Sequence, residues 1–177
     1  MNNFKSIGED VFIHETVIIK HPNLCRIGNH VAIDNGVTIS TVIELDDYIH
    51  IAPYVCTIGG KNTKVTMKNF SFIAAGTKIV TGSEDYTGRG LVGPTIPIEY
   101  RELILGDILF DKYAGCGVNC SVMPGVKFNE GSILGANSIA TSDLDPWTIY
   151  VGSPAKPIKK RNKQIIIEYV KKLGYEF

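Results

Sequence analysis

The chain has 177 residues, of which 44% are hydrophobic and 20% charged, and its 18 Lys and Arg balance 18 Asp and Glu. This length allows one domain with a sizeable core, and the neutral balance excludes a general attraction to nucleic acid or to an anionic membrane. No stretch approaches the roughly 18 consecutive apolar residues of a membrane span, and the first residues lack the apolar segment of a signal peptide. We therefore expect a cytoplasmic protein with no nucleic-acid partner and no membrane insertion.

From Ile7 to Val55 the sequence repeats with a period of six. Ile or Leu recurs at every sixth position, and Val or Ile follows four residues later. A shift of two residues near Pro22–Arg26 interrupts this register, which returns at Ile73 and Ile79 after an insertion at Gly59–Thr66. Neither an α-helix nor an alternating strand predicts a period of six. A short strand followed by a bend does, and three such rows close one coil of a β-helix.

Residues 82–102 break the register and contain two prolines and four glycines. We predict a long loop that projects from one corner of the coils, because loops of this length in compact domains are usually functional. The insertion at Gly59–Thr66 should leave from the same corner one coil earlier. The stretch Gly88–Gly93 matches G-x-G-x-x-G, but it opens no helix and Pro94 follows it, so we exclude a dinucleotide site.

The loop also supplies candidates for contact with a substrate. Aromatic faces pack on sugar rings, and the fork of an arginine grips phosphate. We expect Asp85, Tyr86 and Arg89 to contact the acceptor, with Tyr100 and Arg101 as further candidates. The alternative is that these side chains only anchor the loop.

The repeat is strictest from Phe110 to Ile139, where five rows read FDKYAG, CGVNCS, VMPGVK, FNEGSI and LGANSI. The first positions are apolar: Phe110, Cys116, Val122, Phe128 and Leu134. The fifth positions are small or Val: Ala114, Cys120, Val126, Ser132 and Ser138. This pattern predicts a parallel β-helix whose first and fifth positions point into one continuous core. A sandwich or barrel, the alternative, would space its strands more loosely, at about 8–12 residues.

We expect residues 1–151 to form the β-helix and residues 152–177 to form a C-terminal tail and helix of the same single domain. The helix should run from Asn162 to Leu173, where Ile166, Tyr169, Val170 and Leu173 share one face and Gly174 supplies a stop. It should cap the open end of the prism or pack on a neighbouring subunit.

The repeats, the single long loop and the sequence VGSPAKPIKKR at 151–161 resemble the hexapeptide acyltransferases. This family includes the galactoside, maltose and xenobiotic acetyltransferases and the sugar acetyltransferases of surface-polysaccharide synthesis. The resemblance covers nearly the whole chain, and Phe110–Lys159 carries most of it. It implies an all-β fold, a left-handed parallel β-helix, assembled as a homotrimer with active sites between subunits. It also implies acetyl-CoA as the acyl donor, no metal, and a hydroxyl or amino group of a sugar or nucleotide-linked sugar as the acceptor.

The resemblance further implies which residues contact CoA. The row Tyr113–Cys116 matches the family's Trp-Ile-Gly-Ser row and places Cys116 beside the cofactor, although core packing is the alternative for an inward position. Ala136 and Thr141 match positions along the pantetheine arm. Lys156 and Lys159 match the basic pair that meets the CoA phosphates, and their alternative is a solvated tail.

Transfer to a hydroxyl needs a base that accepts the proton of the acceptor. The related galactoside enzymes carry a loop histidine, and the matching position here is Glu84. His50 stands at the end of a row, where some nucleotide-sugar N-acetyltransferases of this fold carry a histidine, and it is our first candidate. Glu84 or Asp85 is the second, if partial burial raises its pKa. An amino sugar that binds as a free amine needs no protein base.

Other functions remain open at this point. A metal-dependent hydratase with the same fold needs three histidines around one ion, and the four histidines here all precede the loop. A non-catalytic scaffold would explain the missing loop histidine. An acetyltransferase for a small xenobiotic or an amino acid would share the cofactor but not the acceptor.

Overall fold

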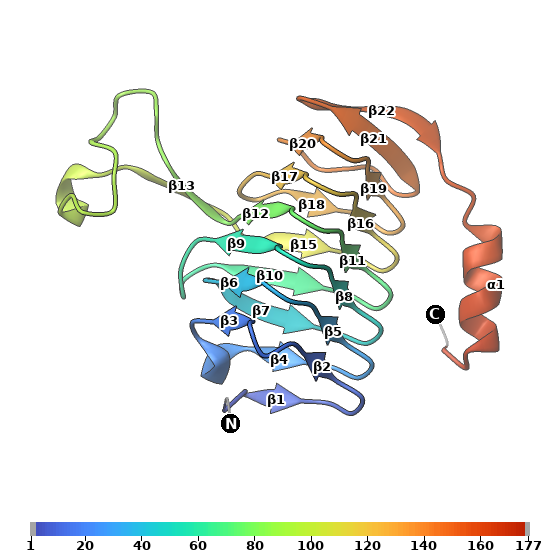
Figure 1. Ribbon diagram of the computed structural model, residues 1–177. Coiled ribbons are helices and arrows are strands. Elements are labelled where there is room, and N and C mark those ends of the chain that lie inside the picture. Colours follow the sequence, from blue (N-terminus) through green and yellow to red (C-terminus); the bar gives the residue numbers. More distant parts are fainter. Residues whose placement is uncertain (1–2, 176–177) are drawn as a thin grey trace.

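The computed structural model describes residues 3–175, which form a three-sided prism of stacked coils (Figure 1). In sheet A the strand order is β1 (Ser6–Ile7), β4 (Arg26–Ile27), β7 (Val42–Leu45), β10 (Lys64–Met67), β15 (Ile108–Phe110) and β18 (Lys127–Phe128). In sheet B it is β2 (Phe12–Ile13), β5 (Ala32–Ile33), β8 (His50–Ile51), β11 (Phe72–Ile73), β16 (Gly115–Cys116), β19 (Ile133–Leu134), β21 (Thr148–Gly152) and β22 (Ala155–Lys160). In sheet C it is β3 (Ile18–Ile19), β6 (Thr38–Ile39), β9 (Cys56–Ile58), β12 (Lys78–Val80), β17 (Ser121–Val122) and β20 (Ile139–Ala140).

The predicted inward positions fill the core of the prism. All five first positions of the run from Phe110 to Leu134 are 0% exposed. The rings of Phe110 and Phe128 stack with centroids 4.3 Å apart, because β15 and β18 pair in parallel and bring these two residues into register. Each buried side chain of this size contributes roughly 1.5–3 kcal/mol. The predicted β-helix is therefore confirmed, and only the first coil departs from the pattern: Ile7 is 51% exposed because no coil lies beneath it.

Three interruptions of the repeat lie at one corner of the prism, where sheet C passes into sheet A. The 3₁₀ turn η1 (Pro22–Leu24) joins β3 to β4, the insertion at Gly59–Thr63 joins β9 to β10, and the long loop joins β12 to β15. Since β9 pairs with β12 and β10 with β15, the last two lie one above the other, as predicted. We call this edge the loop corner. Extra residues are accommodated there because a bend can lengthen without changing the register of the strands.

The long loop has structure of its own and projects well away from the coils (Figure 1). Its stem is an antiparallel hairpin of β13 (Gly82–Glu84) and β14 (Leu103–Leu105), and it contains a 3₁₀ turn, η2 (Ile98–Tyr100). The segment outside the prism therefore extends to Leu105, three residues beyond the boundary expected from the sequence.

Aromatic residues line a second corner, where sheet A passes into sheet B. His30, Tyr48, Phe70, Tyr113 and Trp147 all have positive φ, between 52° and 64°. Their rings stack along the corner with successive centroids 4.5, 5.0, 5.7 and 5.8 Å apart. We call this edge the aromatic corner. Positive φ is uncommon for residues other than glycine, so this stacking stabilises a bend that the backbone alone disfavours.

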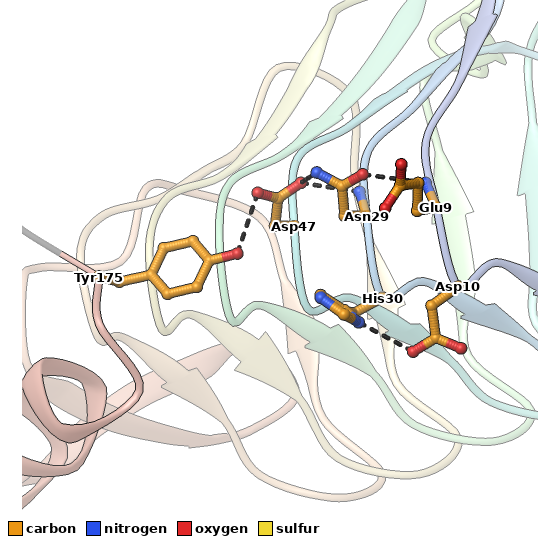
Figure 2. Close-up of polar contacts among 6 residues, drawn as sticks. All are labelled: Glu9, Asp10, Asn29, His30, Asp47 and Tyr175. Carbon is orange, nitrogen blue, oxygen red and sulfur yellow. Dashed lines mark hydrogen bonds and ion pairs between the residues drawn. The ribbon is translucent and has the colours of Figure 1, made fainter.

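A ladder of polar side chains runs beside the aromatic corner (Figure 2). The backbone amide of Glu9 donates to Asn29 Oδ1 at 2.9 Å, that of Asn29 to Asp47 Oδ1 at 2.7 Å, and that of Asp47 to Asn69 Oδ1 at 3.2 Å. Each of these side-chain oxygens thus accepts a hydrogen bond from a backbone amide in the bend of the preceding coil. The hydroxyl of Tyr175 donates to the other oxygen of Asp47 at 3.3 Å and ties the C-terminal segment to this ladder.

The C-terminal segment folds back along the prism instead of capping its end, which corrects one of our two expectations for it (Figure 1). Strand β22, which the sequence did not predict, pairs antiparallel with β21. Arg161 donates to the carbonyl of Tyr113 at 2.7 Å and starts the return along the aromatic corner. Helix α1 (Gln164–Lys172) follows, and Gly174, with φ +83°, ends it as predicted.

Of the predicted apolar face of α1, Val170 is buried, whereas Tyr169 and Leu173 are 59% and 56% exposed. No helix within residues 3–175 is long and apolar enough to cross a membrane.

Replacing Phe110 with Ala should destabilise the protein strongly, because it removes a fully buried ring that stacks on Phe128. We expect a loss of about 3–5 kcal/mol in the free energy of unfolding, seen as a large drop in melting temperature. Phe12→Ala is the matched control, since that ring is 53% exposed on the first coils. Equal melting temperatures for the two variants would contradict the proposed core.

Candidate active site

A cavity of about 760 Å³ lies at the loop corner, between the insertion after β9 and the stem of the long loop. Apolar side chains form part of its wall: Ile58, Val80, Leu103, Leu105 and Met123. Polar groups from the insertion and the loop complete it: Lys61, Asn62, Thr63, Ser83, Glu84, Tyr86 and Arg101. The two segments that break the repeat therefore meet in one pocket, which has an apolar side and a charged side.

Glu84 and Arg101 form the charged side of the cavity. Their side chains are only 14% and 15% exposed, and Arg101 Nη2 donates to Glu84 Oε1 at 2.5 Å. The Arg101 guanidinium lowers the pKa of the Glu84 carboxyl below its ordinary value. A base at this position was expected only if burial raised this pKa, so the structure does not favour Glu84 in that role. The pair instead joins the two arms of the loop, because Glu84 ends β13 and Arg101 lies before β14.

Asp85 organises the beginning of the loop. Its side chain is 1% exposed, and the carboxylate accepts hydrogen bonds from the amide of Thr87 at 2.6 Å, from the Thr87 hydroxyl at 2.5 Å and from Arg89 Nε at 2.8 Å. The Thr87 hydroxyl, followed by the Arg89 guanidinium, lowers the pKa of Asp85 to about 2. Asp85 and Arg89 therefore contact each other, while Tyr86 between them is 75% exposed and lines the cavity.

His50 lies on a different side of the prism from these residues. It is the first residue of β8 in sheet B, whereas the loop leaves from the corner between sheets C and A. Its Nε2 is 2.8 Å from Oδ2 of Asp34, and its side chain is 54% exposed. Within one subunit the first candidate for the base and the loop residues thus face opposite directions.

The residues expected to contact CoA lie on the last coils of the prism. Ala136 and Thr141 are exposed in the bends before and after β20, and Lys156 and Lys159 are exposed on β22. Cys116 is 0% exposed in the core, and burial raises the pKa of its thiol. Its side chain is therefore core packing, the alternative that its inward position had left open.

Two features of the site were not found by sequence reasoning. The insertion after β9 contributes Gly59, Gly60 and Lys61 to the cavity, and the corner that it shares with the long loop was the signal that could have revealed this. Asp34, the partner of His50, went unnoticed because it lies 16 residues earlier, on the neighbouring coil. In residues 3–175 no group of three or more His, Cys, Asp or Glu is arranged to hold a metal ion.

Comparison with known proteins decides the family. No family model matches the chain. Over 166 residues, however, the chain is 35% identical to dTDP-4-amino-4,6-dideoxy-D-glucose acyltransferase of Escherichia coli, and the alignment covers 92% of this chain and 85% of that enzyme. The chain belongs to the hexapeptide-repeat acyltransferases. The predicted family and enzyme class, an acyl-CoA-dependent acyltransferase, are thereby confirmed, and a non-catalytic scaffold is not supported.

Solved structures agree with this assignment. AntD, an N-acyltransferase from Bacillus cereus, was solved with dTDP and 3-hydroxybutyryl-CoA; it is 33% identical, with a TM-score of 0.91 over 98% of this chain and 93% of AntD. A variant of AntD was solved with dTDP-4-amino-4,6-dideoxyglucose and CoA. WbbJ of Escherichia coli K12, named for O-acetyl transfer in lipopolysaccharide biosynthesis, is 30% identical over 122 residues, which are 69% of this chain and 59% of WbbJ.

Asp85→Asn should loosen the loop without unfolding the prism, because it removes the carboxylate that holds Thr87 and Arg89. Trypsin should then cleave after Arg89 several times faster at neutral pH, while the melting temperature changes little. Glu99→Gln, an exposed change in the same loop, is the control. Unchanged cleavage of Asp85→Asn would contradict this role.

The same contacts predict how the wild-type loop responds to acid. A lowered folded-state pKa stabilises the loop above the ordinary Asp value of about 3.9. This stabilisation should fade as the pH falls toward the folded value of about 2. Hydrogen exchange of the segment 85–101 measures it.

Proposed function

We propose that the chain transfers an acyl group from acyl-CoA to the amino group of a dTDP-linked 4-amino-4,6-dideoxyhexose. The observation that carries this proposal is the 35% identity over 92% of the chain to an enzyme named for that acceptor. The AntD complexes with dTDP, the amino sugar and CoA support it. An amine acceptor is favoured over a hydroxyl because AntD is an N-acyltransferase and resembles this chain over nearly its whole length.

The reaction forms an amide C–N bond and breaks the thioester C–S bond, and one proton passes from the amine nitrogen to the sulfur of CoA. The lone pair of the sugar amine attacks the thioester carbonyl, a proton leaves the nitrogen, and the C–S bond breaks to release CoA with its thiol. A neutral amine is already nucleophilic, so the base has a smaller task than it would have with a hydroxyl. His50 remains the first candidate for accepting the proton, because a neutral imidazole has a ring nitrogen with a free lone pair and the side chain is more than half exposed.

The cavity at the loop corner has features that suit a nucleotide sugar. Lys61 lies in its wall, and a lysine can bind a diphosphate as a point charge. Tyr86 offers an exposed aromatic face for a sugar or a base. We assign the acceptor to this cavity and the acyl donor to the last coils, where Ala136 and Thr141 would lie along pantetheine and Lys156 and Lys159 would meet the phosphates.

A homotrimer whose active sites lie between subunits would bring His50 and the long loop together. In one subunit His50 lies on sheet B, and the loop leaves from the corner opposite that sheet. If prisms pack side by side in a ring, the loop of one subunit reaches the sheet B face of the next. The site would then combine His50 of one subunit with the loop of its neighbour. We place the enzyme in the cytoplasm, in the biosynthesis of a surface polysaccharide.

The acceptor assignment is tested by release of the CoA thiol from acetyl-CoA or 3-hydroxybutyryl-CoA. We expect turnover with dTDP-4-amino-4,6-dideoxyglucose and a rate at least about a hundredfold lower with dTDP-glucose, which presents a hydroxyl at the same carbon. The free amino sugar without its nucleotide should bind poorly and raise KM. Equal rates with the amine and the hydroxyl would overturn the proposal of N-acyl transfer.

The shared site is tested by mixing two inactive variants. His50→Ala removes the base, and a short Gly-Ser linker in place of residues 85–101 removes the loop. Random mixing should restore about one quarter of wild-type activity, because about three trimers in four are mixed and each of these holds one intact site of three. If His50 and the loop acted within one subunit, no mixed trimer would contain an intact site, and absence of recovery would contradict the arrangement.

A further inference from the structure

His50 and Asp34 form a polar pair on the sheet B face of the prism. The outward positions of sheet B are in register from coil to coil: Phe12, Ala32, His50, Phe72, Gly115, Ile133 and Ile149. His50 is the one titratable residue among these seven positions, and its neighbours in register are Ala32 and Phe72. The ring of Phe72 lies directly over Gly115, where an added Cβ would come within 2.5 Å of it. The imidazole thus lies between two apolar neighbours on this face.

Asp34 reaches His50 because of the geometry of the coils. It follows Ile33 in its coil, while His50 precedes Ile51 in the next, and Ile33 and Ile51 are partners in the sheet. The two side chains are therefore diagonal neighbours, and Asp34 Oδ2 lies 2.8 Å from His50 Nε2. Asp34 is less exposed than His50, at 28% against 54%, and its amide donates to the carbonyl of Ile51. The carboxylate is consequently held at a fixed place while the ring faces outward.

From this geometry we infer that Asp34 is a positioning residue, which fixes the tautomer and the orientation of His50. An ionised carboxylate only accepts hydrogen bonds, so the ring nitrogen that it contacts must carry a proton. The neutral imidazole is then protonated on Nε2 and has its lone pair on Nδ1, directed away from Asp34. A proton from the acceptor amine would be taken by Nδ1. This inference rests on the proposed function and on His50 as the base.

A second pair, His30 and Asp10, shows what a structural histidine looks like in the same fold (Figure 2). Its contact, from His30 Nδ1 to Asp10 Oδ2, is also 2.8 Å long. The His30 ring, however, stacks on Tyr48 within the aromatic corner, with centroids 4.5 Å apart, and Asp10 is 79% exposed. This pair stabilises a bend, whereas the His50 ring has no stacking neighbour of this kind among the ring contacts of residues 3–175. The His30 pair is therefore a matched control.

The kinetic test uses the full-length enzyme with acyl-CoA and the dTDP-amino sugar. Asp34→Ala should lower kcat about tenfold to a hundredfold, within the range that general base catalysis contributes, with KM for both substrates within about twofold. Asp34→Glu, which keeps the carboxylate, should recover part of this loss. His50→Gln should cost at least as much, and adding Asp34→Ala to it should cost nothing more. Asp10→Ala should leave kcat unchanged, and the melting temperature of each variant checks its folding.

The spectroscopic test does not depend on activity. In ¹⁵N-labelled protein, the imidazole nitrogens of His50, assigned by their absence in His50→Gln, should show the tautomer protonated on Nε2. Asp34→Ala should change them to a mixture of tautomers, whereas Asp10→Ala should leave them as they are.

Different results would contradict the role of Asp34 and the proposed function. An unchanged tautomer in Asp34→Ala, or a further loss of activity when Asp34→Ala is added to His50→Gln, would overturn the inference. A wild-type enzyme that acylates no nucleotide-linked amino sugar would overturn the proposed function instead, and the tautomer would still show whether Asp34 positions His50.

Discussion

The stacking of inward side chains at every sixth residue is the constraint on which the rest of this structure depends. Ile27, Leu45, Met67, Phe110 and Phe128 follow one another across sheet A, and each is 3% exposed or less. A shift of one residue would turn this whole row outward. Extra residues are therefore tolerated only in the bends. The three insertions all lie at the loop corner, and the cavity that we assign to the acceptor is built from two of them.

Bends with positive φ cost conformational energy, and at the aromatic corner contacts between neighbouring coils offset this cost. Asp10 and the five stacked aromatic residues there adopt positive φ without being glycine. Stacked rings and the ladder of Asn29, Asp47 and Asn69 give each bend a partner in the adjacent coil. Because these partners come from successive coils, the corner becomes more stable only as the stack grows. The return of the chain through Arg161 to Tyr175 adds contacts that span several coils at once, which is why the helix lies beside the prism and not on its end.

The sequence predicted the features that follow from the six-residue period and from local signals, and few others. The core positions, the shared corner of two insertions and the helix stop at Gly174 follow from local patterns, and the structure has them. Strand β22 was missed because Ala155–Lys160 contains a proline and has no alternation of apolar residues. The ion pair of Glu84 and Arg101 was missed because 17 residues without a repeat separate them. Without a period, the distance along the chain says nothing about the distance in space, so the lowered pKa of Glu84 was not foreseen either.

The pairing of Asp34 with His50 was only partly predictable from the sequence. Coils without an insertion make residues about one coil apart into neighbours, about 4.8 Å away in the direction of the hydrogen bonds. A separation of 16 residues then means a diagonal contact on one face, so the pair follows from the repeat once the register is known.

The same geometry limits what a single prism can do. Each coil offers only a few outward side chains per face, and inward neighbours such as Ile49 and Ile51 are committed to the core. A face can hold a base and its orienting carboxylate, but it cannot enclose a substrate. Enclosure has to come from a segment that leaves the prism, and here that segment leaves from the opposite corner. In the trimer that we propose, the surface that it covers would belong to a neighbouring copy.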